Sequence, residues 1–143
     1  EGAPAEWPAS GASEVETGNL GDQTYFATIE PWHGDQVVVY REGDGTWSRL
    51  VIGTINGGHT IVTADFDGDG RDEIVAGDRG DGQTLYLWSA EDNGTRWTRQ
   101  VIDDGDMAPS GCLAVDLNHD HQMDIVCIGG RTSNLKWYEN LSH

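Results

Sequence analysis

Basic residues are scarce in this sequence. Its 143 residues include 8 Lys and Arg against 25 Asp and Glu, which gives a formal net charge of −17. Such a charge repels phosphate backbones and anionic lipid, so nucleic acids and membrane surfaces are poor partners. The sequence also has no run approaching the roughly 18 to 20 apolar residues that a membrane span needs, and no visible signal peptide. We therefore expect no nucleic-acid partner and no membrane span.

Helical periodicity is missing as well. No segment sustains a 3.6-residue apolar period, while 20 Gly and many Asp and Asn supply turns, a pattern typical of an all-β fold with almost no helix. The sequence contains no Gly-x-Ser-x-Gly elbow, no His-Glu-x-x-His helix and no phosphate-binding loop. Hydrolase, metalloprotease and kinase interpretations therefore lack support.

Only two cysteines are present, Cys112 and Cys127. They flank an acidic segment, and a hairpin there would bring them nearly opposite one another on neighbouring strands. A disulfide and a pair of buried, apolar thiols are equally compatible with this spacing.

The most informative segment is an acidic loop at residues 65–73, between two apolar runs. Its oxygen donors alternate along the chain, with Gly70 at the sharp turn: the side chains of Asp65, Asp67, Asp69 and Glu73, and the carbonyl of Arg71. A flexible loop with alternating oxygen donors favours binding of Ca²⁺ over binding of the smaller Mg²⁺. The β-branched flanks predict that the loop joins two strands, unlike the helix-flanked loop of an EF-hand.

The acidic pattern recurs at residues 116–124, which predicts a second Ca²⁺ site. The corresponding donors are Asp116, Asn118, Asp120, Gln122 and Asp124. His121 stands where the first loop has Gly70, and a side chain at a tight turn is unfavourable, so we expect weaker binding at the second site. His119 and His121 are expected to point to solvent.

The sequence repeats with a period near 50 residues. Residues 47–52, Trp-Ser-Arg-Leu-Val-Ile, return 50 residues later as Trp-Thr-Arg-Gln-Val-Ile at 97–102. Three copies cover about residues 13–52, 58–102 and 110–140, and each full copy reads as four short strands, the pattern of a propeller blade. In the first copy, Thr17, Asn19, Gly21 and Tyr25 replace the carboxylates, so no cation is expected there.

Three blades do not easily close a ring, because propellers contain about four to eight blades. The third copy also lacks the outer Trp-x-Arg-x-Val-Ile strand. We therefore predict three antiparallel blades from the C-terminal part of a larger ring, of about seven blades. Residues 1–12 read as a linker or loop and residues 13–143 as the partial propeller. The remainder of the ring, or another copy of the chain, is the expected partner that covers the exposed edges.

These features resemble the FG-GAP or VCBS repeats of extracellular β-propellers, whose hallmark is an Asp-x-Asp-x-Asp-Gly loop between the first two strands of a blade. The resemblance covers about residues 13–140 and implies an extracellular or periplasmic protein. Residues 30–35 and 135–140 carry a narrower resemblance to bacterial propeller proteins that are similar to the propeller part of fungal aldos-2-ulose dehydratase.

The loops opposite the acidic bends form a candidate ligand face. Its side chains include an indole that could stack on a sugar ring and polar groups for hydroxyls or a uronate: Trp32, His33, His59, Asp78, Arg79 and Arg131. The alternative is that Trp32 packs between blades and the histidines only hydrogen-bond neighbouring strands.

Carbohydrate binding is thus the leading functional hypothesis. The first alternative is the propeller part of a sugar lyase or dehydratase, with Glu30, His33 and His59 as catalytic or metal-binding candidates. The second is a structural module for protein docking. The recurrent Trp47, Trp88, Trp97 and Trp137 are assigned to packing between blades.

Overall fold

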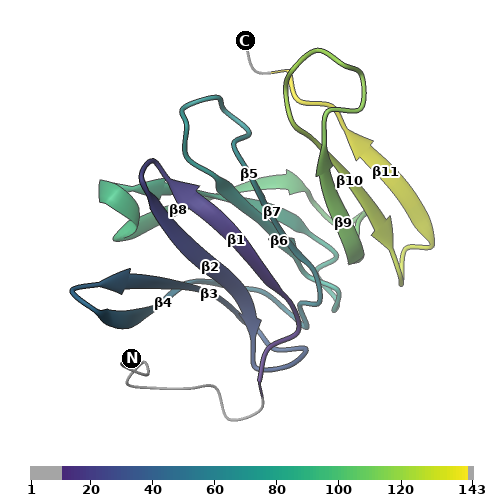
Figure 1. Cartoon of the computed structure of the whole chain (residues 1–143). Helices are drawn as coiled ribbons and strands as arrows, with labels where there is room; N and C mark the ends of the chain where they lie inside the picture. The colour runs from purple at the N-terminus through teal and green to yellow at the C-terminus, as the bar shows by residue number, and fades with distance from the viewer. Residues whose placement is uncertain (1–10, 142–143) are drawn as a thin grey trace.

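The computed structural model describes residues 11–141, which form three antiparallel sheets arranged as successive blades (Figure 1). Blade 1 contains β1 (Val15–Leu20), β2 (Gln23–Glu30), β3 (Gln36–Gly43) and β4 (Thr46–Thr54). Blade 2 contains β5 (Ile61–Ala64), β6 (Glu73–Gly77), β7 (Leu85–Glu91) and β8 (Arg96–Asp103). Blade 3 contains only β9 (Pro109–Val115), β10 (Asp124–Gly129) and β11 (Asn134–Tyr138).

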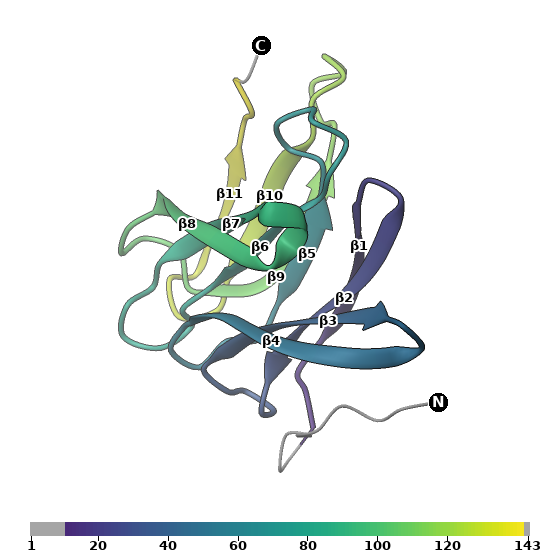
Figure 2. The ribbon, with the colours of Figure 1, turned by 90° about the vertical axis from the view of Figure 1, so that its left-hand side faces the viewer.

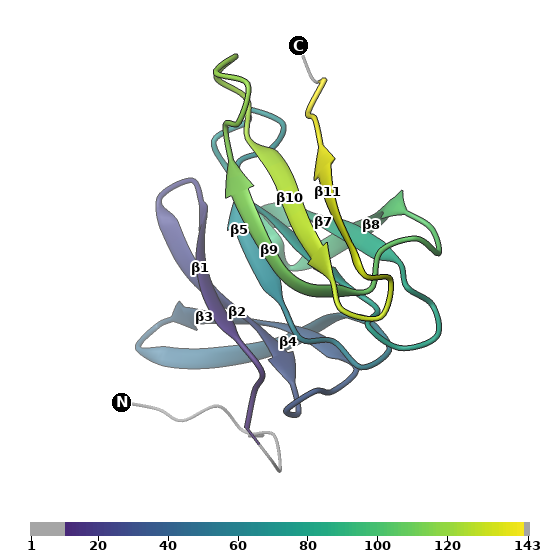
Figure 3. The ribbon, with the colours of Figure 1, turned by 90° about the vertical axis from the view of Figure 1, so that its right-hand side faces the viewer.

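The all-β prediction is confirmed. Between residues 11 and 141 the helical structure is a single 3₁₀ turn, η1 (Asp92–Gly94), and no helix in that range is long and apolar enough to cross a bilayer. Within each sheet every strand pairs with the next in sequence, so the blades are simple meanders. The first strands β1, β5 and β9 lie side by side, and the outer strands β4 and β8 lie farthest from them (Figures 2 and 3). This is the arrangement of neighbouring propeller blades around an axis.

Blades 1 and 2 share one apolar core. Alternation along β2 turns Tyr25, Ala27 and Ile29 toward blade 2, where they meet buried side chains of β5, β6 and β7. Trp88 is fully buried in this core. Trp97 packs edge-on against Tyr25 of the preceding blade, with ring centroids 5.6 Å apart. The predicted packing role of these two tryptophans is therefore confirmed.

Blades 2 and 3 share a second core. Val62, Val75 and Leu85 of blade 2 pack there with Ile125 and Cys127 of blade 3. Within blade 3, the open question about the cysteines is answered: Cys112 and Cys127 face each other across β9 and β10 and form a disulfide. That disulfide spans the bend carrying the second acidic loop.

In blade 1 the acidic loop is replaced by a tight turn. Leu20 pairs directly with Gln23, and Gly21 between them has a φ of 67°. Tyr25 takes the register position that Glu73 has in blade 2, and its ring lies over the buried Gly18. An aromatic side chain therefore fills the space that the other two blades give to a carboxylate.

We predict that Gly18→Ala destabilises the fold. A Cβ at Gly18 would lie 2.2 Å from the ring of Tyr25, which is fully buried and whose hydroxyl is hydrogen-bonded to the Asp72 carbonyl. Overpacking of this kind lowers the free energy of unfolding by about 1–3 kcal/mol, measurable by urea denaturation. Gly43→Ala is the matched control, because a Cβ at Gly43 meets nothing within 4 Å. Equal stability of the two variants would contradict the packing argument.

We also predict that reducing the Cys112–Cys127 disulfide destabilises the protein. The bond closes a loop across a sequence separation of 15 residues. Loss of that constraint on the unfolded chain corresponds to about 3 kcal/mol. Urea denaturation with and without a reductant measures the difference, and a Cys112→Ser/Cys127→Ser double variant should no longer respond to the reductant. An unchanged midpoint on reduction of the wild type would be inconsistent with this role.

Candidate functional site

The first acidic loop brings three of its predicted ligands together. Carboxylate oxygens of Asp65, Asp67 and Glu73 all lie within 4.8 Å of one another. Among the residues that the structure describes, this is the one group of three or more His, Cys, Asp or Glu residues whose ligand atoms lie this close together. The loop leaves β5 and returns as β6, so Asp65 and Glu73 come from the two strand ends and Asp67 from the loop between them.

Asp65 organises the backbone of this loop. Its carboxylate accepts hydrogen bonds from the N–H groups of Gly68 at 2.7 Å, Asp69 at 3.1 Å and Gly70 at 2.9 Å. Gly68 and Gly70 have φ values of 77° and 83°, a region that glycine reaches without strain. The backbone of the loop is therefore curled around the Asp65 carboxylate.

Glu73 is the buried member of the group. It is 3% exposed, and its Oε2 accepts a hydrogen bond of 2.9 Å from the Phe66 N–H. Burial raises the pKa of Glu73 to about 7 even against that hydrogen bond, and the nearby charges of Asp67 and Asp69 add to the effect. A buried carboxylate repelled by its neighbours is electrostatically unfavourable, and a divalent cation would relieve the repulsion.

Asp69, a predicted ligand, is turned toward Arg71 instead. Its carboxylate accepts hydrogen bonds from the Arg71 backbone N–H at 2.8 Å and from Nε at 2.9 Å, and it also pairs with Nη2. Hydrogen bonds from Arg71 hold the pKa of Asp69 below its ordinary value. Asp69 would have to leave this ion pair to join the other three carboxylates.

The second loop repeats the same backbone pattern. Asp116 accepts hydrogen bonds from the N–H groups of Asp120 and His121, both at 3.1 Å, and Gln122 N–H donates to Asp120 at 2.9 Å. His119 and His121 are exposed and have φ values of 65° and 74°. Positive φ at a histidine is strained, which is the physical basis expected for a weaker second site.

Asp124 occupies the position in the second loop that Glu73 occupies in the first, but its negative charge is stabilised differently. One oxygen accepts from Leu117 N–H at 3.1 Å and the other from Asn140 N–H at 2.9 Å. Burial works to raise the pKa of Asp124, but these N–H donors outweigh it and hold the pKa below its ordinary value. Glu139, not identified from the sequence, accepts from Asn118 Nδ2 at 3.0 Å and adds a carboxylate beside this loop.

The first loop is also attached to blade 1. Asp72 N–H donates to the Asn19 carbonyl at 2.7 Å, and Asp72 Oδ2 accepts from Asn19 N–H at 2.7 Å. Tyr25 Oη donates to the Asp72 carbonyl at 2.8 Å. Sequence reasoning missed Asp72 because its partners lie about 50 positions earlier. The conformation of the first loop therefore directly affects the contact between blades 1 and 2.

Both acidic loops lie at one end of the blades and the predicted ligand face at the other (Figure 1). On that opposite face Trp32 is 63% exposed and stacks on His33, with ring centroids 4.3 Å apart. His59 approaches His33 at 5.2 Å between ring centroids. Desolvation and the charges of Arg79 and His59 lower the pKa of His33, which favours a neutral imidazole.

Three other residues predicted for this face have partners within the fold. Glu30 is buried and accepts hydrogen bonds from Thr28 Oγ1, Tyr40 Oη and the Arg49 guanidinium, the closest Arg49 contact being 2.8 Å. Asp78 is buried and accepts from Asn56 N–H at 2.6 Å and from Tyr86 Oη at 3.1 Å. Arg131 forms an exposed ion pair of 3.1 Å with Asp81. The structure thus brings Trp32, His33 and His59 together and gives Glu30 and Asp78 contacts that hold the fold.

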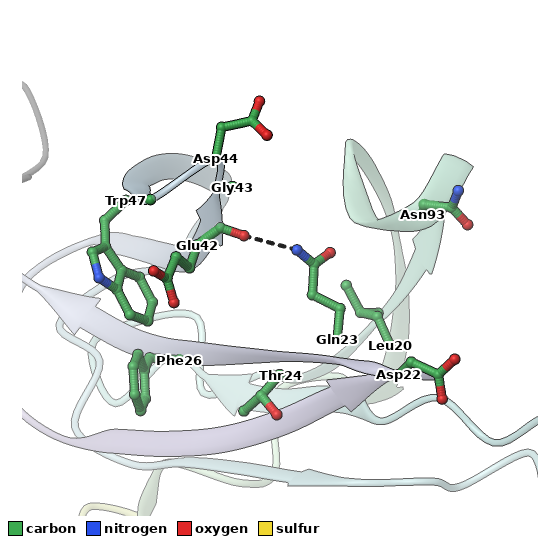
Figure 4. A pocket seen from close by; sticks show the side chains of 11 residues that line it. Leu20, Asp22, Gln23, Thr24, Phe26, Glu42, Gly43, Asp44, Trp47 and Asn93 are labelled. Carbon is green, nitrogen blue, oxygen red and sulfur yellow. Dashed lines mark hydrogen bonds between the residues drawn. The ribbon is translucent and has the colours of Figure 1, made fainter.

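A groove of about 760 Å³ lies between the hairpin tips of blade 1 and η1 of blade 2 (Figure 4). Phe26 and Trp47 stack at one end, with ring centroids 5.2 Å apart, and Asn93 lies at the other. Between them Gln23 Nε2 donates to the Glu42 carbonyl at 2.9 Å. The sequence did not indicate this groove, because its residues come from three separate segments of the chain, and Trp47 is the one lining residue that belongs to the repeated motif.

Two comparisons with known proteins agree with this architecture. An FG-GAP-like repeat model matches twice, at residues 21–76 and 65–127. The chain is also similar to aldos-2-ulose dehydratase of Phanerodontia chrysosporium, with 34% identity over 103 residues. That match covers 57% of this chain and 11% of the relative, so the chain spans a small part of the relative's length. The matched repeats, the acidic bends and the meander sheets lead to one conclusion: the chain belongs to the family of FG-GAP-like repeat proteins.

Proposed function

We propose that this chain is a calcium-stabilised part of an extracellular or periplasmic propeller. The observation that carries the proposal is the convergence of Asp65, Asp67 and Glu73 within 4.8 Å at the bend between β5 and β6. Hard carboxylate oxygens in a flexible, glycine-containing loop suit Ca²⁺. The Cys112–Cys127 disulfide supports a location outside the reducing cytosol, where disulfides persist.

The bound ion has a structural role in this proposal. Asp65, Asp67 and Glu73 would hold it, joined by Asp69 and by the Arg71 carbonyl, and its charge would offset the repulsion among them. Because Asp72 hydrogen-bonds Asn19 of blade 1, a rigid loop also stabilises the contact between blades. The second loop binds more weakly, since its turn has histidines at positive φ and Asp124 already accepts two backbone N–H groups.

We predict two unequal calcium sites. Calorimetric titration of the metal-free chain should show a tighter and a weaker site, and the tighter one should disappear in Asp67→Asn and in Glu73→Gln. At a calcium concentration 100 times the dissociation constant, binding adds about 2.7 kcal/mol to the free energy of unfolding. Asp44→Asn is the matched control, because Asp44 is exposed in the turn between β3 and β4, away from both loops. Heats and stability that do not respond to calcium would refute the proposal.

We further propose that the face around Trp32 binds carbohydrate. Trp32 is 63% exposed, and its indole, with His33 stacked beside it, offers an aromatic surface for the apolar side of a sugar ring. His59, Arg79 and Arg131 supply hydrogen-bond donors for hydroxyls or a uronate on a chain that is otherwise strongly acidic.

We predict that oligosaccharide binding depends on Trp32. Titration with neutral and uronate oligosaccharides should change tryptophan fluorescence, and Trp32→Ala should weaken binding by at least about tenfold. Trp137→Ala is the matched control, since Trp137 is also partly exposed but lies on β11 of blade 3. Binding that survives Trp32→Ala, or that is lost equally in Trp137→Ala, would exclude this face.

A sugar lyase or dehydratase activity is the second candidate. It is favoured by the name of the fungal relative and by the 5.2 Å approach of the His33 and His59 rings. Two adjacent imidazoles could act as acid and base in an elimination of water. Glu30 does not support the activity in this structure, because Arg49 and Tyr40 bind its carboxylate. Formation of an unsaturated product from keto sugars that is lost in His33→Ala and in His59→Ala separates this candidate from simple binding.

A further inference from the structure

The groove of Figure 4 lies at the exposed end of a blade 1 face whose centre is closed. Phe26 and Trp47 are half-buried in the groove, and Glu42 is exposed. Its volume of about 760 Å³ falls within the range of about 300–1,000 Å³ typical of small-molecule sites. Four residues at the centre of the same face are at most 7% exposed: Thr28, Glu30, Val38 and Tyr40.

Hydrogen bonds hold the walls of the groove in place. The pairing of β2 with β3 ends at Tyr25 and Arg41, and the groove opens between the hairpin tips beyond that pair. There the 2.9 Å hydrogen bond from Gln23 to the Glu42 carbonyl joins the two tips. The Arg41 guanidinium donates to the Asn93 carbonyl, which fixes η1 of blade 2 at the other end. Two blades therefore contribute to one preformed groove.

A carboxylate lies beside the aromatic pair. Because β3 lies between β2 and β4, Trp47 reaches over β3 to stack on Phe26. Glu42 on β3 is directly opposite Trp47 in the register, and Figure 4 shows its carboxylate beside the indole. A positive charge at this point would gain both an ion pair and the attraction of the aromatic rings.

The charge of the groove favours a cation. Among the described residues that line it none is basic, and three are acidic: Asp22, Glu42 and Asp44. Figure 4 shows the Asp44 side chain pointing away from the groove, which leaves Glu42 and Asp22 near a ligand. The net charge of −17 on the chain adds to the attraction of cations and the repulsion of anions.

Uncharged polar groups in the groove suit hydroxyls. Gln23 uses its Nε2 on the Glu42 carbonyl, so its Oε1 can accept a further hydrogen bond. Thr24 and Asn93 are exposed along the groove. Together with aromatic rings that can pack on the apolar side of a sugar, these groups indicate a ligand that is both cationic and rich in hydroxyls.

We propose that this groove binds an amino sugar. The ammonium group of the sugar lies against Glu42 and Trp47, and its hydroxyls contact Gln23 and Thr24. The site is separate from the face around Trp32, which lies at the other end of the blades, and it uses no residue of the acidic loops. Binding in the groove depends on Glu42 and binding at the opposite face on Trp32, so the two proposals can fail separately.

Calorimetric titration of the full chain with a glucosamine trisaccharide tests the proposal, in mildly acidic buffer where the sugar amines are protonated. The trisaccharide of N-acetylglucosamine has the same rings without the charges and should bind at least about tenfold more weakly. Glu42→Gln should weaken binding of the glucosamine trisaccharide by a similar factor, because the substitution removes the charge and keeps the shape. Asp104→Asn is the matched control, since it removes one negative charge from the exposed turn between β8 and β9 and should leave the affinity unchanged.

The proposal is overturned by an absence of binding, by equal affinity for the two trisaccharides, or by a Glu42→Gln variant that binds like the wild type. An equal loss of affinity in Glu42→Gln and Asp104→Asn also overturns it, because that result would reflect a general attraction to an acidic chain. Trilysine is the comparison for a basic peptide. If trilysine binds as tightly as the glucosamine trisaccharide and with the same dependence on Glu42, the groove is a peptide site and the assignment to an amino sugar is wrong.

Discussion

The burial of the Glu73 carboxylate at the bend between β5 and β6 is the constraint on which the rest of the site depends. With 3% of the residue exposed and two further carboxylates nearby, its charge is unfavourable unless a cation is close. The adjacent Asp72 connects the same bend to Asn19 and Tyr25 of blade 1. The need to neutralise the buried Glu73 carboxylate therefore affects the loop at residues 65–73, the β5–β6 pair and the interface between blades 1 and 2.

Blade 1 shows how the fold responds when that requirement is removed. Tyr25 stands in the register position of Glu73, the loop shortens to a tight turn, and the Tyr25 ring packs over Gly18 where blade 2 has a buried carboxylate. Blade 3 is intermediate, because it keeps the loop but satisfies Asp124 with backbone N–H groups. The bend between the first two strands is therefore stabilised differently in each of the three blades.

Much of the architecture could be predicted from sequence because its signals repeat. The Trp-x-Arg-x-Val-Ile strands and the two acidic loops identified the blades, and the absent outer strand of blade 3 followed from the missing third copy of that motif. The site was predicted only in part. Neither the ion pair of Asp69 with Arg71 nor the burial of Glu30 against Arg49 follows from spacing, since each depends on side-chain direction. The Asp72 contact and the Phe26–Trp47 groove join residues distant in sequence, which no local pattern encodes.

The most direct measurement of the central claim is anomalous X-ray scattering from crystals grown in millimolar calcium. The account predicts a peak within coordination distance of Asp65, Asp67 and Glu73, with the Asp69 carboxylate released from Arg71 and turned toward the ion. Crystals that show Asp69 still paired with Arg71 and no peak between the three carboxylates would contradict it.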